Sequence, residues 1–208
     1  MKLLHIIASP RGNRSRTLSI SNEFLGVLQS KYSDLIVETL NLSEESLPVL
    51  DGASADAKYM MMGGIEPQGE AKNRFKVITK YATDFLSYDL YLITSPMWNF
   101  SVPYQLKHYI DIIMQPGYLF RFTEQGVEGL AKNKKMFCIT TRGNDYSPGS
   151  YMNQFDFQEP YLRSIFGMTG ITDVTFINAQ PMDVTMEIAK ANLDKAFEDT
   201  KVMVQAIS

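Results

Sequence analysis

The sequence predicts an α/β fold, a three-layer α/β/α sandwich around one five-stranded parallel sheet. Short apolar runs alternate with amphipathic helical patterns from one end of the chain to the other, as in successive βαβ units. The apolar runs are nearly continuous, which is typical of strands covered by helices on both faces. With 208 residues, 45% of them hydrophobic, the chain is long enough for one such domain spanning 1–208.

Five strands and five helices are expected in alternation. The strands are expected at 3–8, 35–40, 90–94, 136–141 and 174–178. The helices are expected at 17–30, 71–87, 103–114, 159–168 and 183–206, with Asp183 as the N-cap of the last. This series fits the flavodoxin-like strand order 2-1-3-4-5. Three segments, 42–70, 115–134 and 142–158, exceed the usual loop length and are either functional or surface insertions.

Charge and composition exclude several classes of protein. The net charge of −3 gives no general attraction for nucleic acid, and no apolar stretch is long enough to span a bilayer. The run at 3–8 is too short for a signal peptide and arginines follow it, so a buried strand is preferred. One cysteine, Cys138, excludes an internal disulfide, and the distant His5 and His108 form no metal-binding pattern. We therefore expect a cytoplasmic protein that binds no metal, nucleic acid or membrane.

The loop after the first predicted strand is a candidate anion site. Free amides at the start of the following helix, together with the helix dipole, attract an anion. The loop adds hydroxyl and guanidinium groups from Ser9, Arg11, Arg14, Ser15, Arg16 and Thr17. Neither G-x-G-x-x-G nor G-x-x-x-x-G-K-[ST] is present, which argues against a dinucleotide bound in the usual way and against a nucleoside triphosphatase. The pattern favours a phosphate monoester, and the alternative is a polar turn with Ser15 as helix cap.

The loop after the third predicted strand combines rigidity with flat side chains. Pro96 and Pro103 stiffen it, Trp98 and Phe100 supply aromatic surface, and Asn99 supplies an amide. Such a loop is suited to the edge of a flat ring. The alternative is an ordinary turn from strand to helix.

The loop after the fourth predicted strand offers a polar edge. Gly143 allows backbone amides to approach a ligand closely, and Arg142, Asn144 and Tyr146 offer polar contacts, although a solvent-exposed turn is the alternative. In the predicted strand order the three loops meet at one crevice. Together they suit a flat heterocycle with a phosphate tail, and FMN fits this description better than a nicotinamide dinucleotide.

Several segments resemble the FMN-dependent NADH:azoreductase family, which is related to the flavodoxin-like quinone reductases. They lie at 96–111, 120–130, 141–143 and 167–174, and Ser9 with the triplet 15–17 is similar to the family's phosphate-binding serines. The resemblance implies one FMN per subunit of an obligate homodimer, with each active site at the subunit interface. It further implies two-electron reduction of quinones and azo compounds with NADH or NADPH.

The resemblance also implies roles for individual residues. The phosphate would be held by Ser9, Ser15, Arg16 and Thr17, with Arg11 nearby. The ring would be lined by Pro96, Met97, Trp98, Asn99 and Phe100, and its polar end approached by Thr141, Arg142 and Gly143. The chain departs from the family at Asn144, which stands where a second glycine is common, and at Trp98, which replaces a common tyrosine.

We assign the substrate pocket to Phe120, Phe122 and Tyr146. The alternative for the two phenylalanines is core packing. We expect a ping-pong cycle of two hydride transfers without a protein nucleophile, in which backbone amides near Asn99 and Gly143 stabilise the reduced ring. The competing functional hypothesis is a flavodoxin-like electron carrier, or a flavin-binding regulatory module, that turns over no substrate.

Overall fold

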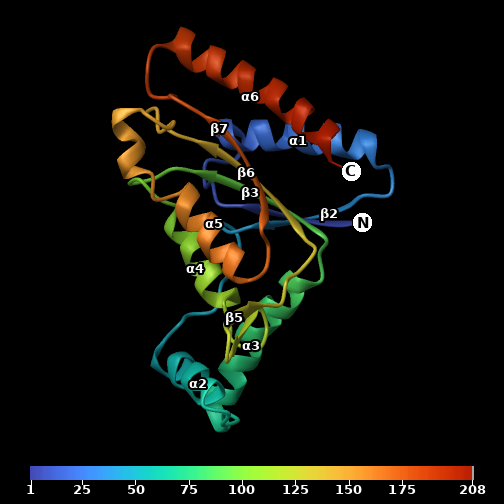
Figure 1. Ribbon diagram of the computed structural model, residues 1–208, viewed down its shortest axis with the longest axis vertical. Helices are drawn as coiled ribbons and strands as arrows, with labels where there is room; N and C mark the ends of the chain where they lie inside the picture. The colour runs from blue at the N-terminus through green and yellow to red at the C-terminus, as the bar shows by residue number, and fades with distance from the viewer. Residues whose placement is uncertain (208) are drawn as a thin grey trace.

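The computed structural model, described over residues 1–207, has a five-stranded parallel sheet between two layers of helices (Figure 1). The strands are β1 (Lys2–Ile7), β2 (Ile36–Asn41), β3 (Leu90–Pro96), β6 (Lys135–Thr141) and β7 (Asp173–Ala179). They pair in the order β2-β1-β3-β6-β7, each with parallel neighbours. All five predicted strands are confirmed. The arrangement is equivalent to the expected 2-1-3-4-5, because two short strands outside this sheet come between β3 and β6 in the chain.

Neighbouring residues of each strand pack against opposite helix layers. Leu3 and Leu92 pack with helices α1 (Arg16–Lys31) and α6 (Met186–Ala206) on one face. Leu4 and Ile93 belong to the core on the other face. That face is covered by α3 (Gly69–Leu86), α4 (Tyr104–Ile113) and α5 (Glu159–Met168). The five predicted helices are therefore present, with ends shifted by a few residues, and the sheet is buried on both sides.

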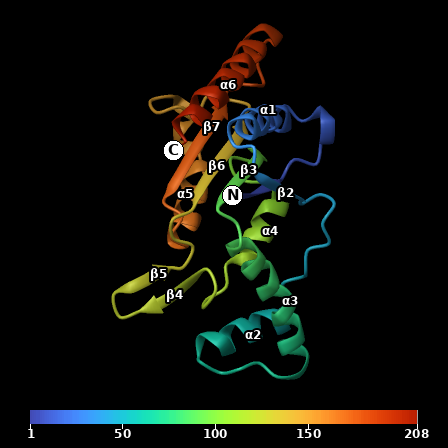
Figure 2. The same cartoon turned by 90° about the vertical axis from the view of Figure 1, so that its right-hand side faces the viewer.

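The long segments contain elements that the sequence analysis did not predict. Helix α2 (Gly52–Met62) begins after Asp51, whose side chain accepts a hydrogen bond from the Ser54 amide at 3.0 Å. Strands β4 (Phe120–Thr123) and β5 (Gly126–Gly129) form an antiparallel hairpin. Two 3₁₀ turns, η1 (Gly12–Arg14) and η2 (Tyr151–Phe155), lie in the loops after β1 and β6. Figure 2 shows the hairpin and α2 projecting on the side away from α1 and α6.

The hairpin is fixed to the end of α5 by a close backbone approach. A Cβ atom on Gly129 would lie 2.2 Å from both the Gly170 nitrogen and the Thr169 carbonyl carbon. The Ala131 amide donates to the Thr169 carbonyl at 2.8 Å. Glycine at 129 therefore allows the 115–134 segment to pack directly against the turn after α5.

The expected N-cap of the last helix is wrong. The side chain of Thr185, not of Asp183, accepts from the Ile188 amide, and α6 begins at Met186. The Asp183 carboxylate instead faces Gly143, where a Cβ atom would approach its Oδ2 atom to 2.5 Å.

Cys138 and His5, which the sequence places within strands, are buried. Burial raises the pKa of the Cys138 thiol. Between residues 1 and 207, no group of three or more histidine, cysteine or acidic side chains is arranged to hold a metal. Among the helices described, none combines the length and apolarity needed to cross a bilayer.

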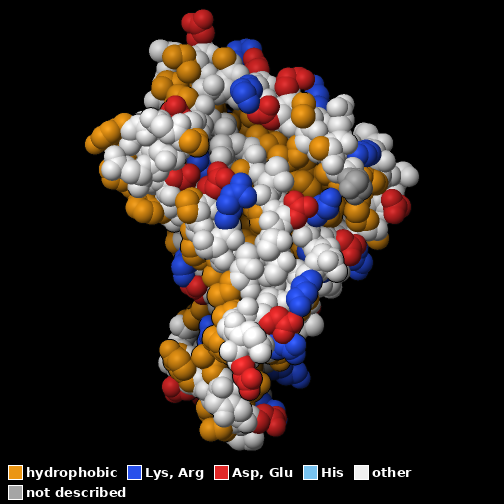
Figure 3. Space-filling view, viewed as in Figure 1, with side chains coloured by type: hydrophobic (Ala, Val, Ile, Leu, Met, Phe, Trp, Pro, Cys, Tyr) orange, Lys and Arg blue, Asp and Glu red, His pale blue; other side chains and the backbone are white. Residues whose placement is uncertain are grey.

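Figure 3 shows apolar side chains gathered beside α6 at the sheet edge, where Phe176, Val202 and Met203 line a groove.

Candidate functional site

A cleft of about 150 Å³ opens at the carboxyl ends of β1, β3 and β6. The amino end of β1 lies at the right of Figure 1, so these carboxyl ends lie toward its left. The lining residues come from three predicted loops and from the segment after β7. They are Ser9, Arg11, Ser15, Arg16, Thr17, Pro96, Met97, Trp98, Thr141, Arg142, Gly143, Met182 and Asp183.

One end of the cleft is the start of α1. Ser9, Ser15 and Thr17 are buried there, at 2%, 4% and 1% exposure. The amides of the first helical turn have no acceptor within the helix, and the helix dipole places positive potential at the same point. Ser15 is also the helix N-cap, since its hydroxyl oxygen accepts from the Leu18 amide at 3.1 Å. Helix capping and an anion site are therefore compatible, because the Ser15 hydroxyl proton remains available.

Two contacts hold this end in place. The Arg16 guanidinium donates to the Met182 carbonyl at 2.9 Å, and the Thr17 and Thr141 hydroxyls are 2.6 Å apart. The Arg11 side chain is exposed at the cleft. The Arg16 guanidinium already donates a hydrogen bond to the backbone, whereas the exposed Arg11 side chain can turn toward an anion.

The loop after β3 forms one wall of the cleft. Trp98 and Ser101 exchange two backbone hydrogen bonds of 2.9 and 3.0 Å, which closes the loop tightly. The two residues between them, Asn99 and Phe100, both have positive φ, at 48° and 68°. This conformation is uncommon for residues other than glycine and marks stored backbone strain. The Met97 amide donates to the Thr141 carbonyl at 2.9 Å and joins this wall to the loop after β6.

Asn99 and Phe100 lie beyond the lining of the cleft. Asn99 lines a neighbouring hollow with Pro103, and Phe100 is 42% exposed and stacks on Phe155, with ring centroids 5.5 Å apart. Their predicted contact with a bound ring stays a prediction.

The loop after β6 places Gly143 at the bottom of the cleft. Its carbonyl accepts from the amides of Met182 and Asp183 at 3.1 and 3.0 Å, and a side chain here would collide with Asp183. Met182 and Asp183 were missed as cleft residues. All parallel strands of a sheet end at the same edge, so the segment after β7 also reaches this cleft. Applying that rule to β7 would have identified both residues.

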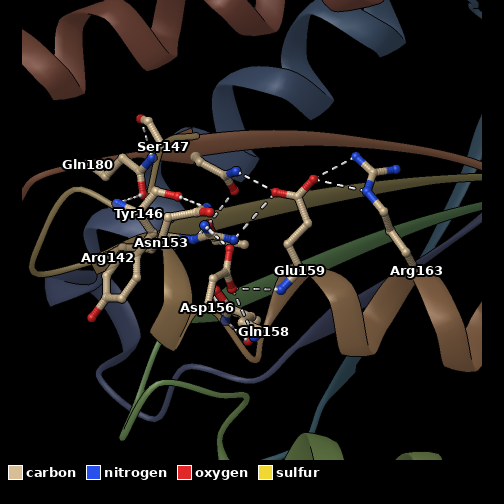
Figure 4. A network of polar contacts seen from close by, with 12 residues as sticks. Arg142, Tyr146, Ser147, Asn153, Asp156, Gln158, Glu159, Arg163 and Gln180 are labelled. Atoms are coloured by element: carbon tan, nitrogen blue, oxygen red, sulfur yellow. Dashed lines mark hydrogen bonds and ion pairs between the residues drawn. The ribbon is translucent and has the colours of Figure 1, made fainter. Parts of the chain in front are cut away.

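The Arg142 side chain is buried and paired with carboxylates (Figure 4). Its Nη1 atom donates to Asp156 Oδ2 at 2.8 Å, and its Nη2 atom lies 3.6 Å from Glu159 Oε2. Burial lowers the pKa of Arg142, although the two carboxylates favour its charged form. Arg142 lines the cleft as expected, and its guanidinium is at the same time paired with carboxylates inside the protein. Its predicted contact with the polar end of a ring stays a prediction.

The three residues expected in the substrate pocket do not line the cleft of this chain. Phe120 is buried in the core, Tyr146 is buried beside Arg142, and Phe122 is 61% exposed on the hairpin. Asn144, expected near the ring, is also absent from the lining. Phe120 and Phe122 lie on the same face of β4, with ring centroids 5.6 Å apart. Phe120 is at the base of the hairpin, where its ring reaches the core, whereas Phe122 is nearer the turn and stays exposed.

Comparisons with known proteins agree with this architecture. A sequence profile for a family described as having a flavodoxin-like fold matches residues 1–203. An FMN-dependent NADH:quinone oxidoreductase of Ruegeria pomeroyi is 39% identical over 197 residues, which are 94% of this chain and 96% of that protein. FMN-dependent NADH:quinone oxidoreductase 1 of Trichormus variabilis is 36% identical over 206 residues, 99% of this chain and 96% of that protein.

A solved structure is similar over nearly the same length. The FMN-dependent NADH-azoreductase of Bacillus anthracis in complex with FMN superposes with a TM-score of 0.84 at 25% identity, covering 98% of this chain and 99% of that one. The likeness therefore extends along the whole sheet and both helix layers, and includes the edge at which the cleft opens.

Proposed function

Because the chain belongs to the flavodoxin-like family of FMN-dependent NADH:quinone oxidoreductases, we propose that it binds FMN in this cleft and reduces quinones and azo compounds with NADH. The observation that carries the proposal is the meeting of three strand-end loops around one cleft, with an anion site at one end. The donor set fits a phosphorylated flavin, since hydroxyls and helix amides suit a phosphate and a glycine-floored slot suits a flat ring.

The FMN phosphate would bind at the start of α1. Ser9, Ser15 and Thr17 would donate hydroxyl hydrogen bonds, and the amides of the first helical turn would add backbone donors. Arg11 and Arg16 would supply positive charge, of which only that of Arg11 is unrestrained. These groups bind and orient the tail of the cofactor.

The flavin ring would lie between the 96–100 loop and Gly143. Pro96, Met97 and Trp98 supply an apolar wall, and Thr141 and Gly143 supply the polar floor. When bound, the flavin supplies the two-electron redox chemistry. The protein would orient the ring, and backbone amides near Gly143 would face its polar edge, where reduction increases negative charge. No nucleophilic side chain is needed for this chemistry.

We infer that the protein is a homodimer with the cleft at the subunit interface. Large apolar side chains are exposed around the mouth of the cleft, among them Trp98, Phe100, Tyr104 and Phe157. Such a concentration is typical of an interaction surface. Phe122 is carried on a hairpin that projects from the domain, and in a dimer it would be available to the partner's substrate pocket.

We expect NADH as donor and a cytoplasmic location. The related enzymes are named for NADH, and the cleft has no second cluster of basic residues that would select a 2′-phosphate. A single buried cysteine is consistent with a reducing compartment.

Binding and turnover test the proposal directly. The purified protein should take up one FMN per chain and show flavin absorption bands, and it should oxidise NADH when a simple quinone is added. Ser15→Ala combined with Thr17→Ala should weaken FMN binding by at least about a hundredfold, because two hydrogen bonds to a charged group are lost. A protein that stays colourless in excess FMN would refute the assignment.

The competing function is an electron carrier or regulatory module that binds flavin without turnover. Steady-state oxidation of NADH with a quinone separates the two, since a carrier would show negligible turnover.

A further inference from the structure

The segment 153–159, which we call the brace, lies against both loops that form the ring end of the cleft (Figure 4). It joins the 3₁₀ turn η2 to the start of α5. None of its residues lines the cleft. Its contacts to the two loops are nevertheless direct, and they come from side chains, backbone and an aromatic ring.

The brace holds the loop after β6 through a buried ion pair. Asp156 Oδ2 accepts from Arg142 at 2.8 Å, and the two side chains are 8% and 1% exposed. The other carboxylate oxygen, Oδ1, accepts from the amides of Gln158 and Glu159 at 3.0 and 3.1 Å. Asn153 donates to the Tyr146 carbonyl at 2.8 Å. Residues 142–146 at the start of the loop after β6 are therefore fixed to the brace at two points.

The brace holds the loop after β3 through Gln158. Its Nε2 atom donates to the Pro96 carbonyl at 3.0 Å and lies 3.3 and 3.4 Å from the Ser95 hydroxyl and carbonyl oxygens. Gln158 is fully buried, so these hydrogen bonds are shielded from water. The buried side-chain amide of Gln158 therefore fixes the end of β3, where the loop that forms the wall of the cleft begins.

The brace also supports the strained part of that wall. The Phe157 amide donates to the Phe100 carbonyl at 3.0 Å, and the Phe155 ring stacks on the Phe100 ring. Phe100 and Asn99 have the positive φ values noted above. A conformation of this kind persists only when its surroundings fix it, and here the brace supplies a hydrogen bond and a stacking partner.

We propose that Asp156 and Gln158 are positioning residues for the flavin reaction, acting through the two loops that contact the ring. The proposal rests on the proposed function, because it assumes a flavin ring between these loops. Apart from the brace, one backbone hydrogen bond joins the two loops within residues 1–207, from the Met97 amide to the Thr141 carbonyl. The brace adds a fixed spacing between the apolar wall and the polar floor, and a ring held between them requires that spacing.

The test compares two identical substitutions within the same segment. Gln158→Leu removes the buried donor at similar size. Gln154→Leu is the matched control, because the Gln154 side chain is exposed and bonds only to the Tyr151 carbonyl. In titrations of protein freed of flavin, we expect Gln158→Leu to weaken binding of FMN and of riboflavin by the same factor, about tenfold. In the FMN-loaded protein we expect it to shift the flavin absorption bands and midpoint potential. Gln154→Leu should stay within about twofold of wild type.

Riboflavin separates this proposal from the phosphate assignment, because it has the ring but no phosphate. If wild type binds no flavin at all, the proposed function fails, and the brace proposal falls with it. If Gln158→Leu lowers thermal stability but leaves flavin affinity, bands and potential unchanged, its role is only structural and the positioning proposal is overturned.

Two further variants keep the proposal testable if Gln158→Leu does not fold. Asp156→Asn keeps the shape but removes the charge that faces Arg142, and Phe155→Ala removes only the ring that stacks on Phe100. We expect both to lower riboflavin affinity roughly threefold or more and to lower kcat more than they raise KM for the quinone. Wild-type values for both variants would overturn the proposal.

Discussion

The two ends of the cleft are built in different ways. The phosphate end comes from the nine residues 9–17, and its donors follow from the start of a single helix. The ring end comes from the loops after β3 and β6, and a buried network joins residues up to 63 positions apart, such as Ser95 and Gln158. An anion site of the first kind is a property of local backbone, whereas a ring site of the second kind depends on contacts that only the folded protein makes.

The difference has an energetic consequence. The phosphate end relies on neutral hydroxyls, and the loss of one leaves the others in place. The ring end contains a buried charge, Arg142, which is stable only while its carboxylate partners remain. Substitutions at the first end should therefore act mainly on ligand binding, whereas removal of a charged partner at the second end should also destabilise the whole fold.

The largest expected effect is that of Asp156→Ala. This change leaves the Arg142 guanidinium buried with only Glu159 nearby, and we expect the free energy of unfolding to fall by about 3–5 kcal/mol. Urea unfolding followed by circular dichroism measures it. Asp145→Ala is the control, because Asp145 is exposed and its carboxylate accepts from Ser147 rather than from a buried charge. An equal loss in both variants would remove the distinction between the two ends.

The next effect concerns the support beneath the phosphate end. His5 Nε2 lies 2.7 Å from the Thr94 hydroxyl, which donates to Ser21, and Ser21 donates to the Thr17 carbonyl in the first turn of α1. Burial lowers the pKa of His5 from 6.5 to about 4. The unfolded chain therefore binds the proton first as the pH falls. Stability from this group is complete above about pH 6.5 and is lost progressively toward pH 4.

At 1.36 kcal/mol per pH unit, the loss from His5 amounts to about 2–3 kcal/mol between pH 7.5 and pH 4.5. His5→Gln removes the titrating group, so its stability should fall less over the same range. Urea unfolding at the two pH values measures both proteins. Parallel pH profiles for wild type and variant would contradict the assignment of a neutral buried histidine.

A smaller effect separates the two ends by ligand. Thr17→Val keeps the side-chain volume but removes the hydroxyl, which is 2.6 Å from that of Thr141. We expect FMN to bind about tenfold more weakly while riboflavin affinity stays within about twofold, because only the phosphate contact is lost. Fluorescence titration with each flavin measures the ratio. An equal loss for both flavins would mean that Thr17 acts on the ring through Thr141.

The same contrast explains which parts of the site could be predicted from the sequence. The strands and the phosphate loop follow from local patterns, and Ser9, Ser15 and Thr17 lie at the cleft as expected. The partners of Arg142 did not follow from the sequence, because a charged residue after a strand looks the same whether it faces a ligand or a buried carboxylate. Phe120 and Phe122 are two residues apart on one face of β4, yet one is buried and the other exposed, and only the docking of the hairpin decides between them.

The smallest expected effect tests whether Ser15 acts as a cap as well as a ligand. Without any flavin, Ser15→Ala removes the acceptor of the Leu18 amide and should lower the free energy of unfolding by about 1 kcal/mol. Ser15→Gly should cost only a few tenths of a kcal/mol, since glycine is tolerated at an N-cap. FMN affinity should fall similarly in both variants, because both lack the hydroxyl. Unfolding curves and titrations of the pair thus separate the two roles of one oxygen atom, and equal stability of the two variants would contradict the capping role.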